Sequence, residues 1–192
     1  MEDAGSLAAE IHALSHTRVA HPGPEGVPVT LDCAMTWPTP PPQLEAAREH
    51  LDLPEQLLEL WSTTDELVLF SDVVYGQDGL RLIGPEEAAR ATAELAEEWV
   101  DNDRGPLTEA LFVIGRFIGD GDRLALNRDT GQIVCLPEIL SLDECQVVAA
   151  SLLEFLAAYR SFAGERYWEH HARTRLMGAL EATGRYDPRS RT

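Results

Sequence analysis

The stretch from Leu107 to Pro137 constrains the fold more than any other part of the chain. Turn residues there separate three short apolar runs: Leu111–Phe117, Arg123–Asn127 and Gln132–Leu136. The Gly-Asp-Gly-Asp loop at 119–122 supplies glycines that tolerate positive φ and aspartates that hydrogen-bond their own backbone. The loop at 128–131 ends in a glycine suited to a bulged hairpin turn. The pattern predicts a three-stranded antiparallel meander, and we expect the rest of the chain to cover it.

Helical and strand patterns alternate before the meander. Apolar residues at helical spacing predict helices over residues 7–14, 43–51, 54–63 and 85–99. Short apolar runs predict strands at Val27–Met35, Leu67–Phe70 and Leu80–Ile83. Residues 36–42 are expected to be extended, because each proline disfavours the α region for the residue before it.

Two further helices are predicted after the meander. Ser141 with Glu144 three residues later fits a capping box for a helix over Leu142–Phe162. A second helix, Glu165–Thr183, ends at a glycine.

Charge is the unusual feature of the composition. The chain has 192 residues with 44% hydrophobic residues, enough for one domain with a substantial core. Its formal net charge is −18, from 33 acids and 15 basic residues, all of them arginine. An acidic surface repels phosphate backbones, which argues against direct nucleic-acid binding, and it attracts a basic protein partner. Acidity that serves solubility alone is the competing interpretation.

The cysteines and the N-terminal residues both bear on the compartment in which the protein is expected to reside. Cys33, Cys135 and Cys145 are odd in number and form no Cys-x-x-Cys pair, so no disulfide framework is expected. The first residues lack the basic region and the continuous apolar segment of a secretory signal. No apolar run approaches the roughly 20 residues that a membrane-spanning helix needs. We expect a cytoplasmic protein that does not bind a membrane.

No metal site is predicted. A calcium loop would need an oxygen ligand two residues after the 119–122 loop, where Leu124 stands. The aspartates are interpreted as turn formers first and as partner contacts second. His12 and His16 share one helical face, and Cys33 could complete a zinc site with them, but ordinary surface histidines are the favoured interpretation.

The sequence lacks catalytic signatures. It has no Gly-x-Ser-x-Gly elbow, and the glycine-rich stretch 115–121 lacks the Gly-Lys-[Ser/Thr] end of a phosphate loop. The cysteines stand in apolar surroundings, where an inert thiol is the default. We therefore predict no catalytic residue and no cofactor.

Four segments form an ordered set of motifs. The first is a Leu-Pro pair that opens a helix, at Leu53–Trp61, and the second is a strand that runs into a helix, at Asp78–Leu82 with Pro85–Glu87. The third lies within the meander, at Ile114–Gly115, Gly121–Leu124 and Gly131–Val134. The fourth is a closing helix, at Ala149–Leu156. Together they cover about residues 43–159, and in this order they resemble the SUKH superfamily of Smi/Knr-type domains. Thr63–Glu66 departs from the Asn-Gly-Gly turn that is common in that family.

The resemblance implies a fold and a role. The fold is α+β, with an antiparallel or mixed sheet of about five to six strands, a central meander and helices covering it at both ends. We expect residues 43–162 to form the SUKH-like domain, residues 1–42 an N-terminal extension packed on it, and residues 163–192 a C-terminal helix and arginine-rich tail. The typical role is that of a bacterial immunity protein that binds and neutralises a polymorphic toxin; other members are implicated in regulating cell-wall synthesis in fungi.

The leading hypothesis is a non-catalytic immunity protein whose loop acids capture a basic toxin stoichiometrically. An intracellular regulatory scaffold that binds a host protein is the alternative, and a small-molecule-handling enzyme is the least favoured. The predicted partner contacts are loop acids and two tryptophans in less regular segments: Asp65, Glu66, Asp72, Asp78, Asp120, Asp122, Trp37 and Trp168. For both tryptophans, docking within the chain ranks ahead of partner contact.

Overall fold

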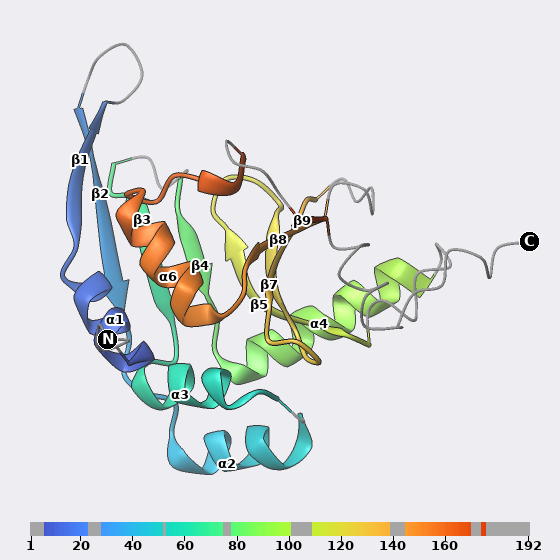
Figure 1. The fold of residues 1–192 in the computed structure, drawn as a ribbon. Coiled ribbons are helices and arrows are strands. Elements are labelled where there is room, and N and C mark those ends of the chain that lie inside the picture. The colour runs from blue at the N-terminus through green and yellow to red at the C-terminus, as the bar shows by residue number, and fades with distance from the viewer. Residues whose placement is uncertain are drawn as a thin grey trace, which may run out of the picture.

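The fold is built on one antiparallel sheet in which each strand pairs with the next along the chain (Figure 1). The computed structural model describes residues 6–22, 28–51, 53–74, 78–100, 109–138, 145–169 and 174–175. Within them the sheet has nine strands: β1 (Arg18–Pro22), β2 (Pro28–Met35), β3 (Leu67–Asp72), β4 (Leu80–Leu82), β5 (Leu111–Phe117), β6 (Arg123–Asn127), β7 (Ile133–Leu136), β8 (Gln146–Ala149) and β9 (Thr174–Arg175).

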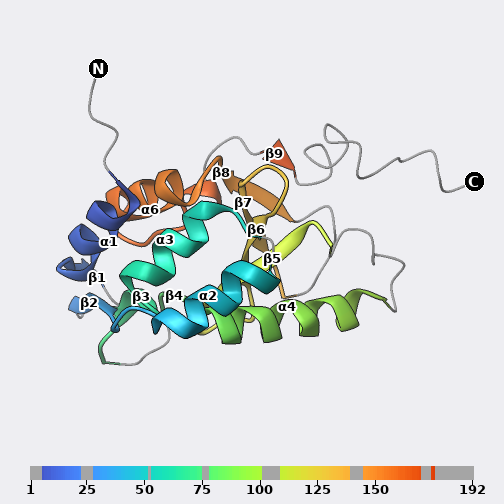
Figure 2. The ribbon, with the colours of Figure 1, turned by 90° about the horizontal axis from the view of Figure 1, so that it is seen from below.

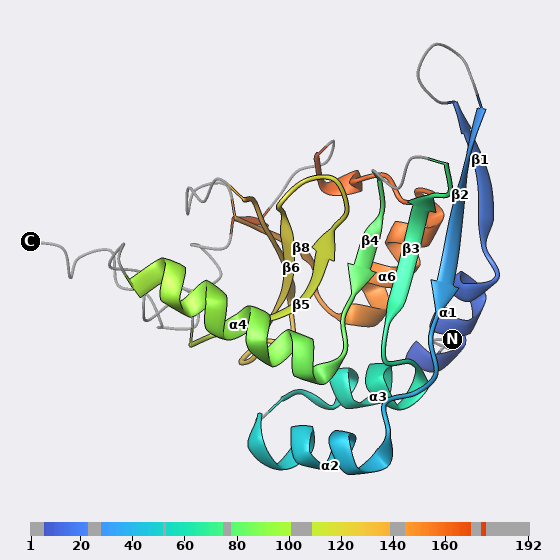
Figure 3. The same cartoon turned by 180° about the vertical axis from the view of Figure 1, so that it is seen from behind.

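Helices cover both faces of this sheet. α1 and α6 lie on one face and α4 crosses the other, while α2 and α3 lie at one end of the strands (Figure 1, Figure 2 and Figure 3). The described helices are α1 (Leu7–Ser15), α2 (Pro41–His50), α3 (Glu55–Thr63), α4 (Pro85–Val100), α6 (Leu152–Ser161) and the short 3₁₀ helix η2 (Tyr167–Glu169). None of them is long and apolar enough to cross a membrane.

A single apolar cluster fills the space between the sheet and its helices. Trp61 on α3 is fully buried, and its indole Nε1–H donates to the carbonyl oxygen of Ile83 at 3.0 Å. The indole also meets the ring of Phe112 edge-on, with 6.3 Å between the ring centroids. Trp61 therefore joins α3 both to β5 and to the link between β4 and α4.

The predicted meander is confirmed as β5, β6 and β7. In its first loop the Asp120 carboxylate accepts the Asp122 backbone N–H at 3.1 Å, and in its second loop the Asn127 side chain accepts the Asp129 N–H at 3.0 Å. Gly131 has a φ of 73°, a conformation that glycine adopts with little steric cost. These local bonds are the turn chemistry that the sequence indicated.

The predicted helices before the meander are confirmed as α1 to α4, but the sheet contains more strands than the expected five or six. One cause is the N-terminal region, where the predicted single strand has a partner: Val19 lies opposite Leu31 in a β1–β2 hairpin. Helix α2 also starts at Pro41, which shortens the segment expected to be extended.

The predicted helix over Leu142–Phe162 is wrong in its first half. Val147 lies in strand β8, opposite Val134 of β7, and α6 begins only at Leu152. The N-cap of α6 is Ser151, whose hydroxyl accepts the Glu154 N–H at 3.1 Å. The predicted cap, Ser141, lies outside the described residues. β-branched residues favour the strand, which explains why the helix starts late.

The predicted helix over Glu165–Thr183 is also wrong where the chain is described. Residues 167–169 form η2 and residues 174–175 form β9, which pairs with β8. Gly164, with a φ of 86°, turns the chain after α6. Residues 176–183 lie outside the described residues.

Replacing Trp61 by Phe should destabilise the fold by about 2–4 kcal/mol, because the Ile83 carbonyl loses its donor and a cavity opens in the core. Urea unfolding of the Trp61→Phe chain measures this loss. Trp37 is 88% exposed, so Trp37→Phe is the matched control, and it should change the free energy of unfolding by less than about 0.5 kcal/mol. Equal losses in the two variants would contradict the structural role of Trp61.

Candidate functional site

The structure divides the predicted partner contacts between the two ends of the sheet. Trp37, Asp65 and Glu66 lie where β2 ends and β3 begins, which we call the α2 end. Asp78 and the 119–122 loop lie where β4 begins and β5 ends, beside η2, which we call the η2 end. Since the strands run between these ends (Figure 1), a single surface does not hold all the predicted acids.

Two of the predicted contacts are buried. Asp72 is 5% exposed, and its carboxylate accepts the Val74 N–H at 2.7 Å. Trp168 is 4% exposed, and its indole packs 5.8 Å from the ring of Phe117, measured between centroids. Trp168 is therefore not an exposed anchor, because its indole completes an aromatic cluster under η2. The higher-ranked prediction, docking within the chain, holds for Trp168 and is wrong for Trp37, which is 88% exposed.

Arg166 binds both aspartates of the meander loop. Arg166 Nη1 donates to Asp122 Oδ2 at 2.7 Å, and Arg166 Nη2 pairs with Asp120. The guanidinium also lies over the Phe117 ring, 4.2 Å from its centroid. Asp120 and Asp122 thus hold the C-terminal segment against the meander in addition to shaping their own turn.

At the α2 end, Asp65 and Glu66 are fixed by bonds to the segment after β2. The Asp65 carboxylate accepts the Thr39 hydroxyl at 2.6 Å, and the Asp65 N–H donates to the Trp37 carbonyl at 2.8 Å. A β-carbon at Gly84 would lie 2.6 Å from Asp65 Oδ1, so only glycine allows this carboxylate so close to the start of α4. The N-terminus of a helix favours such a negative charge.

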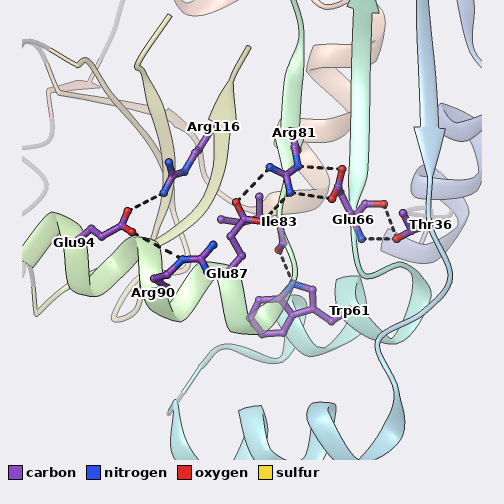
Figure 4. Close-up of polar contacts among 9 residues, drawn as sticks. All are labelled: Thr36, Trp61, Glu66, Arg81, Ile83, Glu87, Arg90, Glu94 and Arg116. Carbon is purple, nitrogen blue, oxygen red and sulfur yellow. Dashed lines mark hydrogen bonds and ion pairs between the residues drawn. The ribbon is translucent and has the colours of Figure 1, made fainter. Parts of the chain in front are cut away.

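Arg81 connects Glu66 to helix α4. Its guanidinium lies 3.0 Å from Glu66 Oε1 and 2.7 Å from Glu87 Oε2 (Figure 4). The hydrogen bond that Arg81 donates to the Glu66 carboxylate raises the pKa of Arg81, so the guanidinium stays charged. One cation therefore bridges a strand-end carboxylate and a carboxylate in the first turn of α4.

Arg81 is the first member of a row that we call the arginine ladder, which consists of Arg81, Arg116 and Arg123. Arg81 lies opposite Arg116 across β4 and β5, and Arg116 lies opposite Arg123 across β5 and β6. Like charges directly opposite each other destabilise a sheet, so each needs a counter-charge. Helix α4 provides them at 2.7, 3.0 and 2.7 Å, from Glu87, Glu94 and Glu98 respectively.

The glutamates of α4 are spaced so that each one reaches an arginine of the ladder. The three glutamates are spaced seven and four residues apart in the sequence, which places them on one side of the helix. Beside them, the Thr92 hydroxyl accepts the Val113 backbone N–H at 2.9 Å, at a bulge in the β5–β6 pairing. Charge pairs and this hydrogen bond together fix where α4 lies on the sheet.

A groove runs from the acids of the α2 end along the space between α2 and α4, and we call it the acidic groove. Its polar part, of about 190 Å³, is lined by Gln43, Asp65, Glu66, Gly84, Pro85, Glu86, Glu87 and Arg90. Its apolar part, of about 300 Å³, shares Gln43, Pro85 and Glu86 and adds Ala46, Ala47, His50, Leu51 and Ala89. Trp37, bonded through its carbonyl to Asp65, presents an exposed indole at the same end.

The acidic groove was only partly predicted. Asp65, Glu66 and Trp37 were singled out from the sequence, whereas the α2 and α4 residues that line the groove were not. A usable signal was present in α4, because Glu86 and Glu87 open the helix next to the small residues Ala88 and Ala89. Small side chains let a neighbouring element approach but leave an apolar surface between two helices.

The cysteines offer no nucleophile at this site. Cys33, Cys135 and Cys145 are buried, and none of the three is in a disulfide. Burial raises the pKa of Cys135 to about 12, so its thiol stays protonated near neutral pH. Within the described part of the chain, no three His, Cys, Asp or Glu side chains gather as metal ligands.

A comparison with protein families finds a match over the elements that form the groove. The model described as the SMI1 / KNR4 family (SUKH-1) matches residues 42–158. This range runs from α2 into α6 and includes the arginine ladder. No curated protein matches the chain.

Acidification should remove the contribution of the ladder's last pair. The hydrogen bonds from Arg123 to Glu98, at 2.8 and 2.7 Å, lower the pKa of Glu98 in the folded chain. The pair therefore stabilises the fold above the unfolded pKa of about 4.3 and loses this effect as the pH falls through the folded value. Glu98→Gln should lower the free energy of unfolding by about 0.5–1 kcal/mol at pH 7 and by much less at pH 3.

Denaturant unfolding from pH 7 to pH 3 checks this difference. The matched control is Glu97→Gln, because Glu97 is exposed on the same helix and has no ion pair among the described residues. A Glu98→Gln deficit that stays constant over this pH range would contradict the role of the charge pair.

Proposed function

The chain belongs to the SMI1/KNR4 (SUKH-1) family, and on that basis we propose that it is a non-catalytic immunity protein that binds a cognate bacterial toxin stoichiometrically and so neutralises it. The acidic groove is the observation that supports this proposal best. It combines a charged end, an apolar floor and an exposed tryptophan in one region, which are the components of a protein-binding surface.

The charges of the groove select a basic partner. Asp65 and Glu86 line its polar part together with Glu66 and Glu87, which are paired with Arg81, and Arg90 is the cation among the lining residues. The whole chain carries a formal net charge of −18, so its field adds to the local one. A basic toxin would be attracted over long range and oriented towards the α2 end, which raises the rate of association at low salt.

The apolar part of the groove would slow dissociation of the bound toxin. Leu51, Ala47 and Ala89 face the space between α2 and α4. Trp37 is 88% exposed next to the acids, and an indole in such a place is a strong anchor when a partner covers it. A basic segment with an apolar side fits both parts, and the body of the immunity protein would then cover the toxin's active site.

The direct test is co-expression with the product of the neighbouring gene. If that product is the toxin, cells should die when it is expressed alone and survive when this chain is present, and the two proteins should co-purify in equal amounts. A lethal product that stays lethal without forming a complex would contradict immunity for that pair. A harmless product that still binds would favour the scaffold.

Charge reversal at the groove should separate this surface from general acidity. Glu86→Lys, in the exposed first turn of α4, should weaken the complex about tenfold or more, chiefly through slower association at low salt. Glu97→Lys makes the same change of net charge near the other end of α4 and should alter affinity by less than about twofold. Surface plasmon resonance at two salt concentrations measures both, and equal effects of the two variants would contradict binding at the groove.

A further inference from the structure

A second cavity lies at the η2 end of the sheet, away from the acidic groove. Its volume is about 260 Å³. Apolar side chains form much of its wall: Val29, Leu31, Phe70 and Phe117. The acids Asp78, Asp120 and Glu165 line it as well, so the cavity combines apolar walls with acidic groups.

A buried tyrosine is part of the cavity wall. Tyr159 of α6 is 2% exposed and lines the cavity, and no group in the described part of the chain hydrogen-bonds its Oη. Burial raises the pKa of Tyr159, so the hydroxyl keeps its proton. Buried tyrosine hydroxyls ordinarily have a partner. The Tyr159 hydroxyl is therefore a polar group at the cavity that the described part of the chain leaves without a partner.

The walls around this hydroxyl are set by tight packing. Phe70 has a φ of 51°, a conformation that costs a non-glycine residue about 1–2 kcal/mol. Its ring packs edge-on against Tyr159, with 5.6 Å between centroids. A β-carbon at Gly164 would lie 2.5 Å from Phe70 Cβ, so the chain after α6 lies directly on this residue. The cavity is thus preformed.

The charge balance of the cavity favours a cation. Arg166 lines it, but its guanidinium is already bonded to Asp120 and Asp122. The exposed carboxylate of Asp78 has no bond or ion pair within the described residues. A ligand that offers a positive charge to Asp78 and a hydrogen bond to Tyr159 Oη would satisfy both groups.

We propose that this cavity binds a primary alkylammonium group, with its carbon chain against Leu31 and Phe70 and its ammonium between Asp78 and the Tyr159 hydroxyl. The small volume suits a short chain. Two sources carry this group, a free small amine and a lysine side chain of another protein. The site lies at the opposite end of the sheet from the acidic groove, so the proposal of an amine site does not depend on the immunity role.

The test uses n-butylammonium as the probe and 1-butanol as its uncharged match. In ¹⁵N-labelled protein, n-butylammonium should shift the amide signals of Gly79 and Gly164 saturably, since both residues line the cavity. Tyr159→Phe should weaken binding about two- to tenfold by removing one hydrogen bond, and Asp78→Asn about two- to fivefold by removing one charge pair. Glu97→Gln should leave it unchanged.

A second arm distinguishes the two sources. A capped pentapeptide with one central lysine among alanines should saturate the same signals if the cavity accepts a protein side chain; binding of n-butylammonium alone assigns the site to free amines. Three results would overturn the proposal: no saturable shift with either probe, equal affinity for 1-butanol, or unchanged affinity in both cavity variants. The amide spectra of the variants report whether each remains folded.

Discussion

The arginine ladder is the interaction on which the rest of the structure depends. Arg81, Arg116 and Arg123 face one another across adjacent strands, an arrangement that is unfavourable unless each charge is neutralised. Helix α4 neutralises all three with a row of glutamates. Arginine suits this task better than lysine, because its planar fork can bond two carboxylates at once, as Arg81 does. The chain uses no lysine at all.

The position of α4 has a functional consequence at the α2 end. Once the ladder fixes the helix, its first turn lies next to Asp65, with Gly84 leaving room for the carboxylate. The same turn forms one wall of the acidic groove, and α2 forms the other. Structural charges thus hold the helix, while other acids at its start remain at the surface for a partner. The two sets of carboxylates differ in role although the sequence does not distinguish them.

The sequence predicts an element well where its signals are local. The meander is marked by turn residues whose side chains bond their own loops, so β5 to β7 were predicted almost to the residue. Strand β8 was missed because Val148 also fits a helical apolar stripe with Leu152 and Phe155, and only pairing with β7 decides between strand and helix. Two Ser-x-x-Glu patterns occur ten residues apart, and the local sequence does not distinguish them. In the structure the second, at Ser151, caps the helix.

In the candidate site, too, local features could be predicted from the sequence, whereas long-range contacts could not. Trp37, Asp65 and Glu66 were recognisable as loop residues, but their proximity to α4 depends on strand register and on the ladder, which no local pattern encodes. At Trp168 the local sequence predicts the wrong element. Its neighbours in the sequence suggest a terminal helix, whereas its burial depends on Phe117 and Phe155, which come from distant elements.

Hydrogen exchange at a single amide tests the central claim most directly. The Val113 N–H donates to Thr92 of α4, so its exchange reports separation of the helix from the sheet. The Asn127 N–H bonds within the meander and serves as the reference. In an Arg116→Met/Arg123→Met chain, exchange at Val113 should accelerate about tenfold or more while Asn127 changes little. Equal acceleration at both amides, or none at Val113, would contradict a ladder that holds α4 in place.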